Sequence, residues 1–220
     1  MPLLAGALLE RTPGPKYIAD LRYAELNLST PLPKPSTLRR WREKLPEDFQ
    51  LALRAPKAVW QGVAGGGSAR GTDADATWLN EAADALGAVL VVLATGPGIT
   101  TGQRDRDRLE RLFQQIDQGD DRKLAWRPTG LWEPETVQQL AARCGVLAGF
   151  DPLEDPTPTV DPLYGSLVAE GFRRSFSHAL LGDVATLVQA SGATQAYITI
   201  ASNQSFQEAK LLQSLLQGQT

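Results

Sequence analysis

The sequence contains almost none of the residues that most often bind metals or form disulfide bonds. Its 220 residues include one histidine, His178, and one cysteine, Cys144. A lone cysteine cannot form an internal disulfide, and zinc sites usually combine several histidine, cysteine and carboxylate ligands. We therefore expect a metal-independent protein without a cofactor. Cys144 falls in a helical pattern and is predicted to be a small buried side chain, in preference to a nucleophile activated by the histidine.

Long apolar segments and a strong net charge are missing as well. No apolar run approaches the ~18 residues of a membrane-spanning helix. The short run Leu3–Leu9 has no basic residues before it, so we do not expect a signal peptide. The net charge of −3 and the isoelectric point of about 5.3 argue against a surface that attracts nucleic acid everywhere, but they allow a local basic groove. We expect a soluble, cytoplasmic protein that does not contact membranes. The sequence does not predict an oligomeric state.

The apolar residues that are present alternate between strand-like and helix-like patterns. Ala88–Thr95 is continuously apolar and rich in β-branched residues, which is typical of a strand buried on both faces of a parallel sheet. Leu3–Leu9 is either a degenerate first strand or a loose arm. Further strands are predicted over Tyr23–Leu28, Phe49–Leu53, Lys123–Arg127, Val146–Phe150, Leu163–Ala169 and Gln195–Ala201. Helices are predicted after an N-cap at Ser36 and over Ala74–Leu86, Gln103–Ile116, Glu133–Cys144, Ser177–Ser191 and Ser205–Leu216.

This alternation predicts the fold class. Repeated βα units in one domain imply a parallel sheet, and eight of them close into a barrel. Barrels of this kind need at least ~200 residues, so we predict one α/β domain over residues 1–220 with a trimmed TIM-type (β/α)8 barrel. An open doubly wound sheet is the alternative. No glycine-rich phosphate-binding motif follows a predicted strand, and residues 64–72, AGGGSARGT, are predicted to be a flexible loop.

Four blocks of the sequence resemble the DUF72 (YecE-like) family. They are AELNLSTPLPKPSTLRRW, EDFQLALRAPK, RKLAWRPTGLW followed by GVLAGFDP, and QAYITIASNQSFQEAKLLQSLL. The resemblance runs from about Tyr17 to Leu216 and implies a TIM-type barrel and a bacterial protein. The sequence departs from the family pattern where the family has a glutamate and a histidine, because Ala125 and Pro128 stand there. The glycine-rich strand with which the family begins is not recognisable. The chain is therefore similar to a divergent member of the family.

Six polar residues of the family pattern remain, and each lies at or just after the end of a predicted strand: Glu25, Asn27, Arg54, Arg127, Asp151 and Asn203. Barrel enzymes place their sites at this end of the strands. The two arginines are predicted to bind a phosphate or carboxylate, with Asn27 and Asn203 as further ligand contacts. Glu25 and Asp151 are the candidates for a general base. The alternative is that these charged groups pair with one another and have a structural role.

Two functions stay open at this point. The first is a barrel that binds, or weakly hydrolyses, an anionic metabolite or a nucleic-acid fragment. The second is a catalytically inactive barrel that serves as a binding or scaffold protein, as the missing glutamate and histidine suggest. A basic and aromatic segment, FRRSF at Phe172–Phe176, is of the type that holds single-stranded nucleic acid, although a capping or packing role is favoured.

Overall fold

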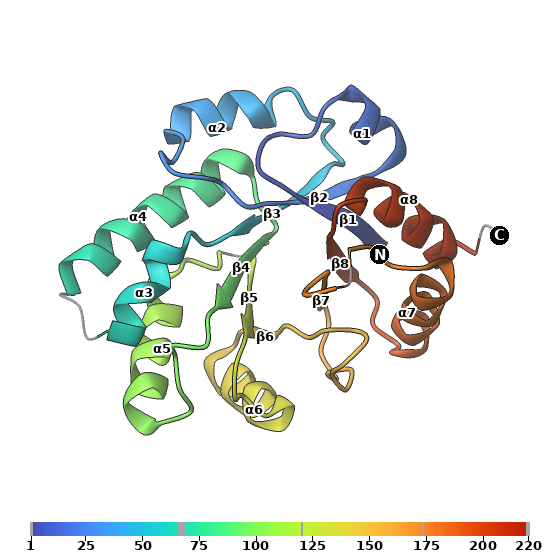
Figure 1. Ribbon diagram of the computed structural model, residues 1–220. Coiled ribbons are helices and arrows are strands. Elements are labelled where there is room, and N and C mark those ends of the chain that lie inside the picture. Colours follow the sequence, from blue (N-terminus) through green and yellow to red (C-terminus); the bar gives the residue numbers. More distant parts are fainter. Residues whose placement is uncertain (1, 66–68, 120, 173, 219–220) are drawn as a thin grey trace. The chain divides into compact units, whose positions relative to one another are not determined.

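Parallel strands alternate with helices along the whole chain (Figure 1). The computed structural model describes residues 2–65, 69–119, 121–172 and 174–218. The strands are β1 (Leu3–Leu9), β2 (Tyr23–Leu26), β3 (Gln50–Arg54), β4 (Leu90–Thr95), β5 (Lys123–Pro128), β6 (Leu147–Ala148), β7 (Leu163–Val168) and β8 (Ala196–Ala201). The helices are α1 (Pro15–Asp20), α2 (Pro35–Arg42), α3 (Lys57–Gly65), α4 (Ala69–Leu86), α5 (Gln103–Gln115), α6 (Pro134–Cys144), α7 (His178–Ala190) and α8 (Ser205–Leu216).

The chain divides into two units, which we describe separately. Unit 1 comprises Met1–Leu26, Glu47–Gln50 and Gly149–Thr220. Unit 2 comprises Asn27–Pro46 and Leu51–Ala148. The expectation of a single domain over residues 1–220 stays a prediction.

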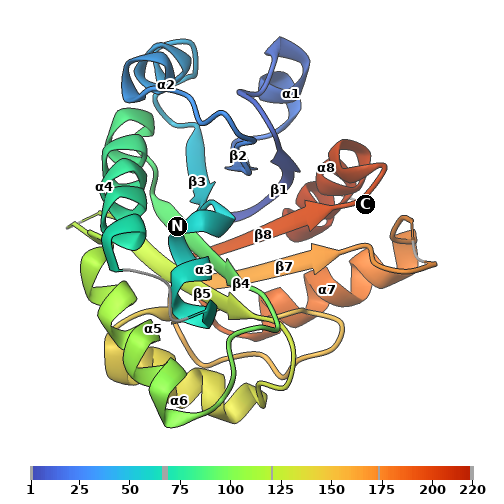
Figure 2. The same ribbon diagram turned by 60° about the vertical axis from the view of Figure 1, so that its left-hand side comes forward.

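In unit 1 the strands lie in the order β2-β1-β8-β7, and Figure 2 shows β7 and β8 side by side. Helix α8 packs against β1 and α7. Its Gln213 side chain accepts a hydrogen bond of 2.8 Å from the backbone N–H of Ala5. On the other side of β7, Phe150 and Gly165 form a parallel bridge. A Cβ atom at Gly165 would come within 2.9 Å of Ile198, so this close approach requires glycine.

The register of unit 1 gathers its polar strand residues on one face. Thr199 has Gly6 on one neighbouring strand and Ser166 on the other as its Cα partners. Because side chains alternate along a strand, the same face carries buried tyrosines and a buried carboxylate. Its polar members are Tyr23, Glu25, Tyr164, Ser166, Tyr197 and Thr199. The opposite face is apolar and offers Ala5, Ala7, Leu163, Leu167, Ile198 and Ile200 to the helix layer.

In unit 2 the strands lie in the order β6-β5-β4-β3. Trp126 of β5 is fully buried, and its ring centroid lies 5.5 Å from that of Phe113 on α5. The face that carries Trp126 is therefore the face that the helices cover. Val91 of β4 pairs with Leu53 on one side and Leu124 on the other, and all three lie on this apolar face. Residues one position away along each strand point to the opposite face.

Most predicted elements are present within one or two residues, and the differences have local causes. Leu3–Leu9 is strand β1 and not a loose arm. The predicted loop at residues 64–72 is shorter, because helix α3 extends to Gly65 and α4 begins at Ala69; residues 66–68 lie outside the described residues. The N-cap of α2 is Lys34 and not Ser36, because a proline occupies the first helical position.

We expect Val91→Asp to abolish folding. Val91 is 1% exposed in the middle of β4, and an unpaired charge there costs several kcal/mol against a total stability of roughly 5–15 kcal/mol. The conservative control, Val91→Ala, should fold with a loss of about 2–3 kcal/mol. Circular dichroism and thermal melting of purified protein test this. A soluble Val91→Asp protein with the native spectrum and melting temperature would contradict the placement of this residue.

Candidate functional site

Two arginines lie on the same face of the unit 2 sheet, at the carboxyl ends of their strands. Arg54, the last residue of β3, has Val92 as its Cα partner on β4. Arg127 of β5 pairs with Ala94, two residues further along β4. Side chains of residues two apart point the same way, so Arg54 and Arg127 both lie on the face opposite Trp126. The register therefore brings the two arginines to one face and one end of the unit 2 sheet, and their role in binding a ligand stays a prediction.

Only small or aliphatic side chains separate the two arginines on that face. Strands are about 4.8 Å apart and rise about 6.6 Å per two residues, so the two Cα atoms are roughly 12 Å apart. Ala94 and Ala125 lie between them in the ladder, together with Val92. Both arginines are half-buried, and each already has an interaction partner. Ala125 stands where the family has a glutamate. Its Cα partner on β4 is Val92, which is also the Cα partner of Arg54 on β3.

Hydrogen bonds and close contacts connect the ends of β4 and β5, and the loops that follow them, at this end of the sheet. The Trp126 indole N–H donates to Thr95 Oγ1 at 3.1 Å, and the backbone N–H of Thr129 donates to the Thr95 carbonyl at 3.0 Å. Further out, the indole N–H of Trp132 donates to the Ile99 carbonyl at 3.0 Å. Gly130 has a φ of +98° and would place a Cβ atom 3.1 Å from the backbone of the β4 loop. The backbone around Arg127 is thus held by several buried contacts.

A third cation begins the helix after β3. Lys57 is exposed at the first position of α3, and its Nζ atom lies 6.0 Å from the ring centroid of Trp60. The Trp60 ring fills the space beside Gly96, where a Cβ atom would come within 2.8 Å of it. Sequence reasoning did not select Lys57, although its position three residues after Arg54 is a usable signal. Asn27 is exposed directly after β2, and no described contact places it with the arginines.

In unit 1, Glu25 is a fully buried carboxylate on the polar face of the sheet. It is 0% exposed, and the Tyr164 hydroxyl donates to its Oε2 atom at 2.8 Å. Ser166 on the same face is also fully buried, and its Oγ atom has no hydrogen-bond partner among the described residues. Buried carboxylates need such donors, because an unpaired charge in the interior is costly. The surroundings of Glu25 suit either a structural network or a base held in a fixed orientation.

Tyr23 is central to this polar face. Its hydroxyl lies 2.9 Å from Thr199 Oγ1, and its ring reaches over Gly6, where a Cβ atom would come within 2.7 Å of the ring. Burial, reinforced by the negative charge of Glu25, raises the pKa of Tyr23 well above its usual value. Burial also raises the pKa of Tyr197 to about 12. Sequence reasoning missed these phenols, although Tyr23 lies two residues before Glu25 and so had to share its face.

The remaining candidates in unit 1 lie in loops and hold those loops together. Asp151 Oδ1 accepts from the backbone N–H of Leu153 at 2.9 Å, which closes a turn. Asn203 is exposed, and its backbone N–H donates to the Arg174 carbonyl at 3.2 Å. A buried carboxylate that the sequence did not reveal, Glu208, accepts from the backbone N–H of Phe176 at 2.6 Å and from the Ser202 hydroxyl. This carboxylate joins the loops after β7 and β8.

The basic and aromatic segment after β7 is divided between surface and core. Phe172 is fully exposed, whereas Phe176 is buried. Arg174 is exposed, and Arg173 lies outside the described residues. Among the described residues of this segment, the packing role therefore fits Phe176.

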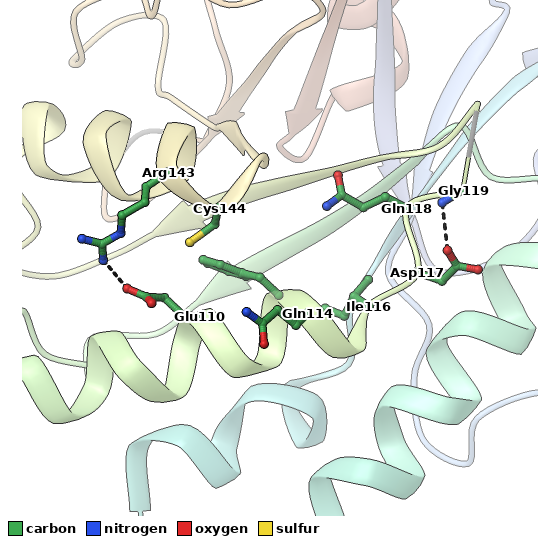
Figure 3. Close-up of a pocket in the computed structure, with 9 residues that line it drawn as sticks. Glu110, Gln114, Ile116, Asp117, Gln118, Gly119, Arg143 and Cys144 are labelled. Atoms are coloured by element: carbon green, nitrogen blue, oxygen red, sulfur yellow. Dashed lines mark hydrogen bonds and ion pairs between the residues drawn. The ribbon is translucent and has the colours of Figure 1, made fainter.

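A separate pocket of about 540 Å³ lies in unit 2 between the ends of α5 and α6 (Figure 3). Its wall includes Cys144, which is partly exposed and not buried as the sequence predicted. Because α5 and α6 run back against the direction of the strands, this pocket lies at the end of the sheet opposite to Arg54 and Arg127. Burial is the main cause that raises the pKa of the Cys144 thiol, so the thiol is not activated.

Metal ligands do not gather anywhere in the described part of the chain. Within residues 2–65, 69–119, 121–172 and 174–218, no three histidine, cysteine or carboxylate side chains lie close enough to hold a metal ion. Of the helices that the structure describes, none combines the length and the apolar character needed to cross a membrane.

Comparison with known proteins identifies the fold. No protein-family model matches the sequence, and no curated protein sequence is significantly similar to it. Among solved structures, a DUF72 family protein from Enterococcus faecalis is similar with a TM-score of 0.75 and 12% identity, over 98% of this chain and 96% of that one. A DUF72 family protein from Thermotoga maritima has a TM-score of 0.68 and 15% identity, over 90% and 85% of the two chains.

Endonuclease IV from Thermus thermophilus is a third similar structure, with a TM-score of 0.55 and 13% identity over 98% of this chain and 99% of that one. The protein therefore has the TIM-type (β/α)8 barrel fold, as the alternation of strands and helices predicted. Within that class, it shares the fold of DUF72 family proteins. The resemblance of the four sequence blocks is confirmed at the level of the fold.

We expect removal of metal ions to leave the protein unchanged. The reasons are its single histidine and the scattered positions of its carboxylates in the described ranges. Thermal melting before and after prolonged treatment with EDTA should give the same midpoint. Elemental analysis that finds tightly bound zinc in a one-to-one ratio would contradict this expectation.

Stability should fall as the pH rises above 10, the ordinary pKa of tyrosine. Below that pH Tyr23 is protonated in both the folded and the unfolded chain, and its ionisation has no effect on stability. Above it the unfolded chain loses the proton that the buried phenol keeps, which favours unfolding by up to about 1.4 kcal/mol per pH unit. Denaturant titrations between pH 9 and 11 should show a shallower decline for Tyr23→Phe. Equal slopes for the variant and the wild type would contradict this assignment.

Proposed function

We propose that the protein binds an anionic ligand at the carboxyl ends of β3 and β5, through Arg54 and Arg127. The ligand class is a phosphate-bearing metabolite or a nucleic-acid fragment. The observation that supports this proposal most directly is the register of β3, β4 and β5, which gives both arginines the same face and the same end of the sheet. The proposed site lies at the end of the strands where TIM-type barrels bind their ligands.

The chemistry of the side chains suits an oxyanion. A guanidinium presents N–H donors in a planar fork that matches phosphate and carboxylate oxygens, and it stays charged at all physiological pH values. Lys57, at the first position of α3, offers a third positive charge at this end of the sheet. The small side chains of Ala94 and Ala125 leave the arginines as the largest polar groups on this face. An anion of modest size could then be held between the two guanidiniums.

We expect the binding to be weak and sensitive to salt. Both arginines already have interaction partners, so an incoming anion has to compete with them. Neither guanidinium is fully exposed, and each is only partly screened by water. A phosphodiester chain offers several anionic groups, so an oligonucleotide should bind more tightly than free phosphate. The name of one structural neighbour, endonuclease IV, is a further reason to include oligonucleotides among the probes.

A catalytic role is supported less well than binding. The family glutamate is replaced by Ala125 on the same face as the arginines, so this face lacks that carboxylate. Glu25 keeps a carboxylate, but it is fully buried and accepts a hydrogen bond from Tyr164. The second candidate function is therefore a catalytically inactive barrel that binds its ligand without transforming it. We also propose that the protein works in a reducing compartment such as the bacterial cytoplasm, since its one cysteine cannot form an internal disulfide.

Replacing either arginine by alanine should weaken anion binding about 10- to 100-fold, because a hydrogen bond to a charged group contributes about 1.5–3 kcal/mol. Isothermal titration calorimetry with inorganic phosphate and with a short single-stranded oligonucleotide measures this for the wild type, Arg54→Ala and Arg127→Ala. Arg40→Ala is the matched control, since Arg40 is exposed in the last turn of α2, away from the carboxyl ends of the strands. Wild-type binding that neither Arg54→Ala nor Arg127→Ala weakens would refute the site. Wild-type protein that binds neither probe at low salt would refute the function.

A further inference from the structure

The pocket between α5 and α6 is a large feature of the described surface that the proposed anion site does not use. Its volume of about 540 Å³ lies within the range of small-molecule sites. All its lining residues come from α5, α6 and the loop between α5 and β5. Figure 3 shows Cys144, at the end of α6, facing α5 across the space between the two helices.

The floor of the pocket is apolar and anchored in the core. Phe113 is 2% exposed and Ile116 is 3% exposed, and the Phe113 ring packs against Trp126 of β5. These side chains cannot change position without disrupting the packing of the unit 2 core. An apolar part of a ligand would therefore meet a fixed surface, and an aromatic face favours a cation placed above it.

The ends of two helices give the pocket a negative potential. Helix α5 ends at Gln115 and α6 ends at Cys144, and residues from the last turn of each helix line the pocket. The last carbonyl groups of a helix lack intrahelical partners and carry the negative end of its dipole. Gly145 ends α6 in a left-handed conformation, with a φ of +68°. Two such ends at one cavity favour positive charge and disfavour negative charge.

The side chains around the pocket add to this potential. The one basic residue in its lining, Arg143, is bound by Glu110 across the two helices, as the dashed line in Figure 3 marks. Nearby Arg122 is paired with Asp84 at 2.5 Å, and its guanidinium also donates to the backbone carbonyl of Asp117 at 3.4 Å. Asp117 forms no salt bridge with any residue in the described ranges, and its Oδ1 atom accepts only a backbone N–H, that of Gly119, at 2.9 Å. Among the described lining residues, Asp117 is thus the one whose charged group forms no salt bridge.

We propose that this pocket binds an organic cation: a primary ammonium group carried on a short apolar chain or ring. The ammonium group lies against Asp117, in the negative potential at the carboxyl-terminal ends of α5 and α6, and the apolar part packs on Phe113 and Ile116. This site is independent of the proposed anion site, because it lies at the opposite ends of the strands and shares no residue with it. The protein then has two small-ligand sites of opposite charge preference within unit 2.

Three probes of similar shape and different charge test the proposal: phenethylamine, the neutral 2-phenylethanol and the anionic 3-phenylpropanoate. Cys144 is the only cysteine and lines the pocket, so it reports occupancy directly. Its modification by 4,4′-dithiodipyridine, a neutral thiol reagent, is followed at pH 8.5, because the raised pKa of the thiol slows the reaction at neutral pH. We expect phenethylamine at millimolar concentration to slow modification at least threefold more than 2-phenylethanol does. The carboxylate should give no protection.

The variants separate charge from shape. Asp117→Asn should raise the concentration of phenethylamine needed for half protection by about threefold or more, in the range measured for partly exposed ion pairs. Asp107→Asn removes the same charge from the exposed surface of α5, outside the pocket, and should have no effect. Calorimetry of phenethylamine binding to the wild type and to Asp117→Asn should give the same ratio of affinities without the thiol reagent. The proposal is overturned if the alcohol or the carboxylate protects as well as the amine, if no probe protects, or if Asp117→Asn behaves like Asp107→Asn.

Discussion

The alternation of side chains across parallel strands is the constraint on which the rest of the structure depends. In unit 2 it separates the face that carries Trp126 from the face that carries Arg54 and Arg127. Because the strands are parallel, their carboxyl ends also lie at one edge of the sheet. A shift of one residue in the register would exchange the two faces, and it would bury the arginines under the helices while exposing the tryptophan. Strong burial of Trp126 therefore also fixes where the arginines point.

Unit 1 uses the same alternation to build a buried polar layer. Glu25 can remain buried because the register brings Tyr164 within hydrogen-bonding distance of its carboxylate. Tyr23 can reach Thr199 because the residue between them in the ladder is Gly6, which has no side chain to block the ring. The cost of burying these polar groups is offset by the bonds among them. This layer therefore tolerates fewer substitutions than the apolar face behind it.

The direction of the helices connects the two ligand sites that we propose for unit 2. Each helix returns against its strands, so the amino-terminal ends of helices lie beside the carboxyl ends of strands. Positive potential from helix ends and from Arg54, Arg127 and Lys57 then falls at one end of the sheet. Negative potential from the ends of α5 and α6 and from Asp117 falls at the other. The opposite directions of strand and helix in each βα unit thus favour an anion at the carboxyl ends of the strands and a cation at their amino ends.

The sequence by itself determined the order and type of most elements, since apolar periodicity and helix-ending glycines depend only on neighbours in the chain. The short helices α1 and α3 were not predicted. The sequence also determined that Arg54 and Arg127 end parallel strands, and so share an edge. Tertiary structure alone decided which buried groups meet, such as Tyr164 with Glu25, because these residues are 139 positions apart. It likewise decided that Cys144 borders a pocket, since that depends on how closely α5 approaches α6. Local sequence patterns indicate which face of a strand or helix a residue occupies. The distances between separate elements follow from tertiary packing, which local patterns do not specify.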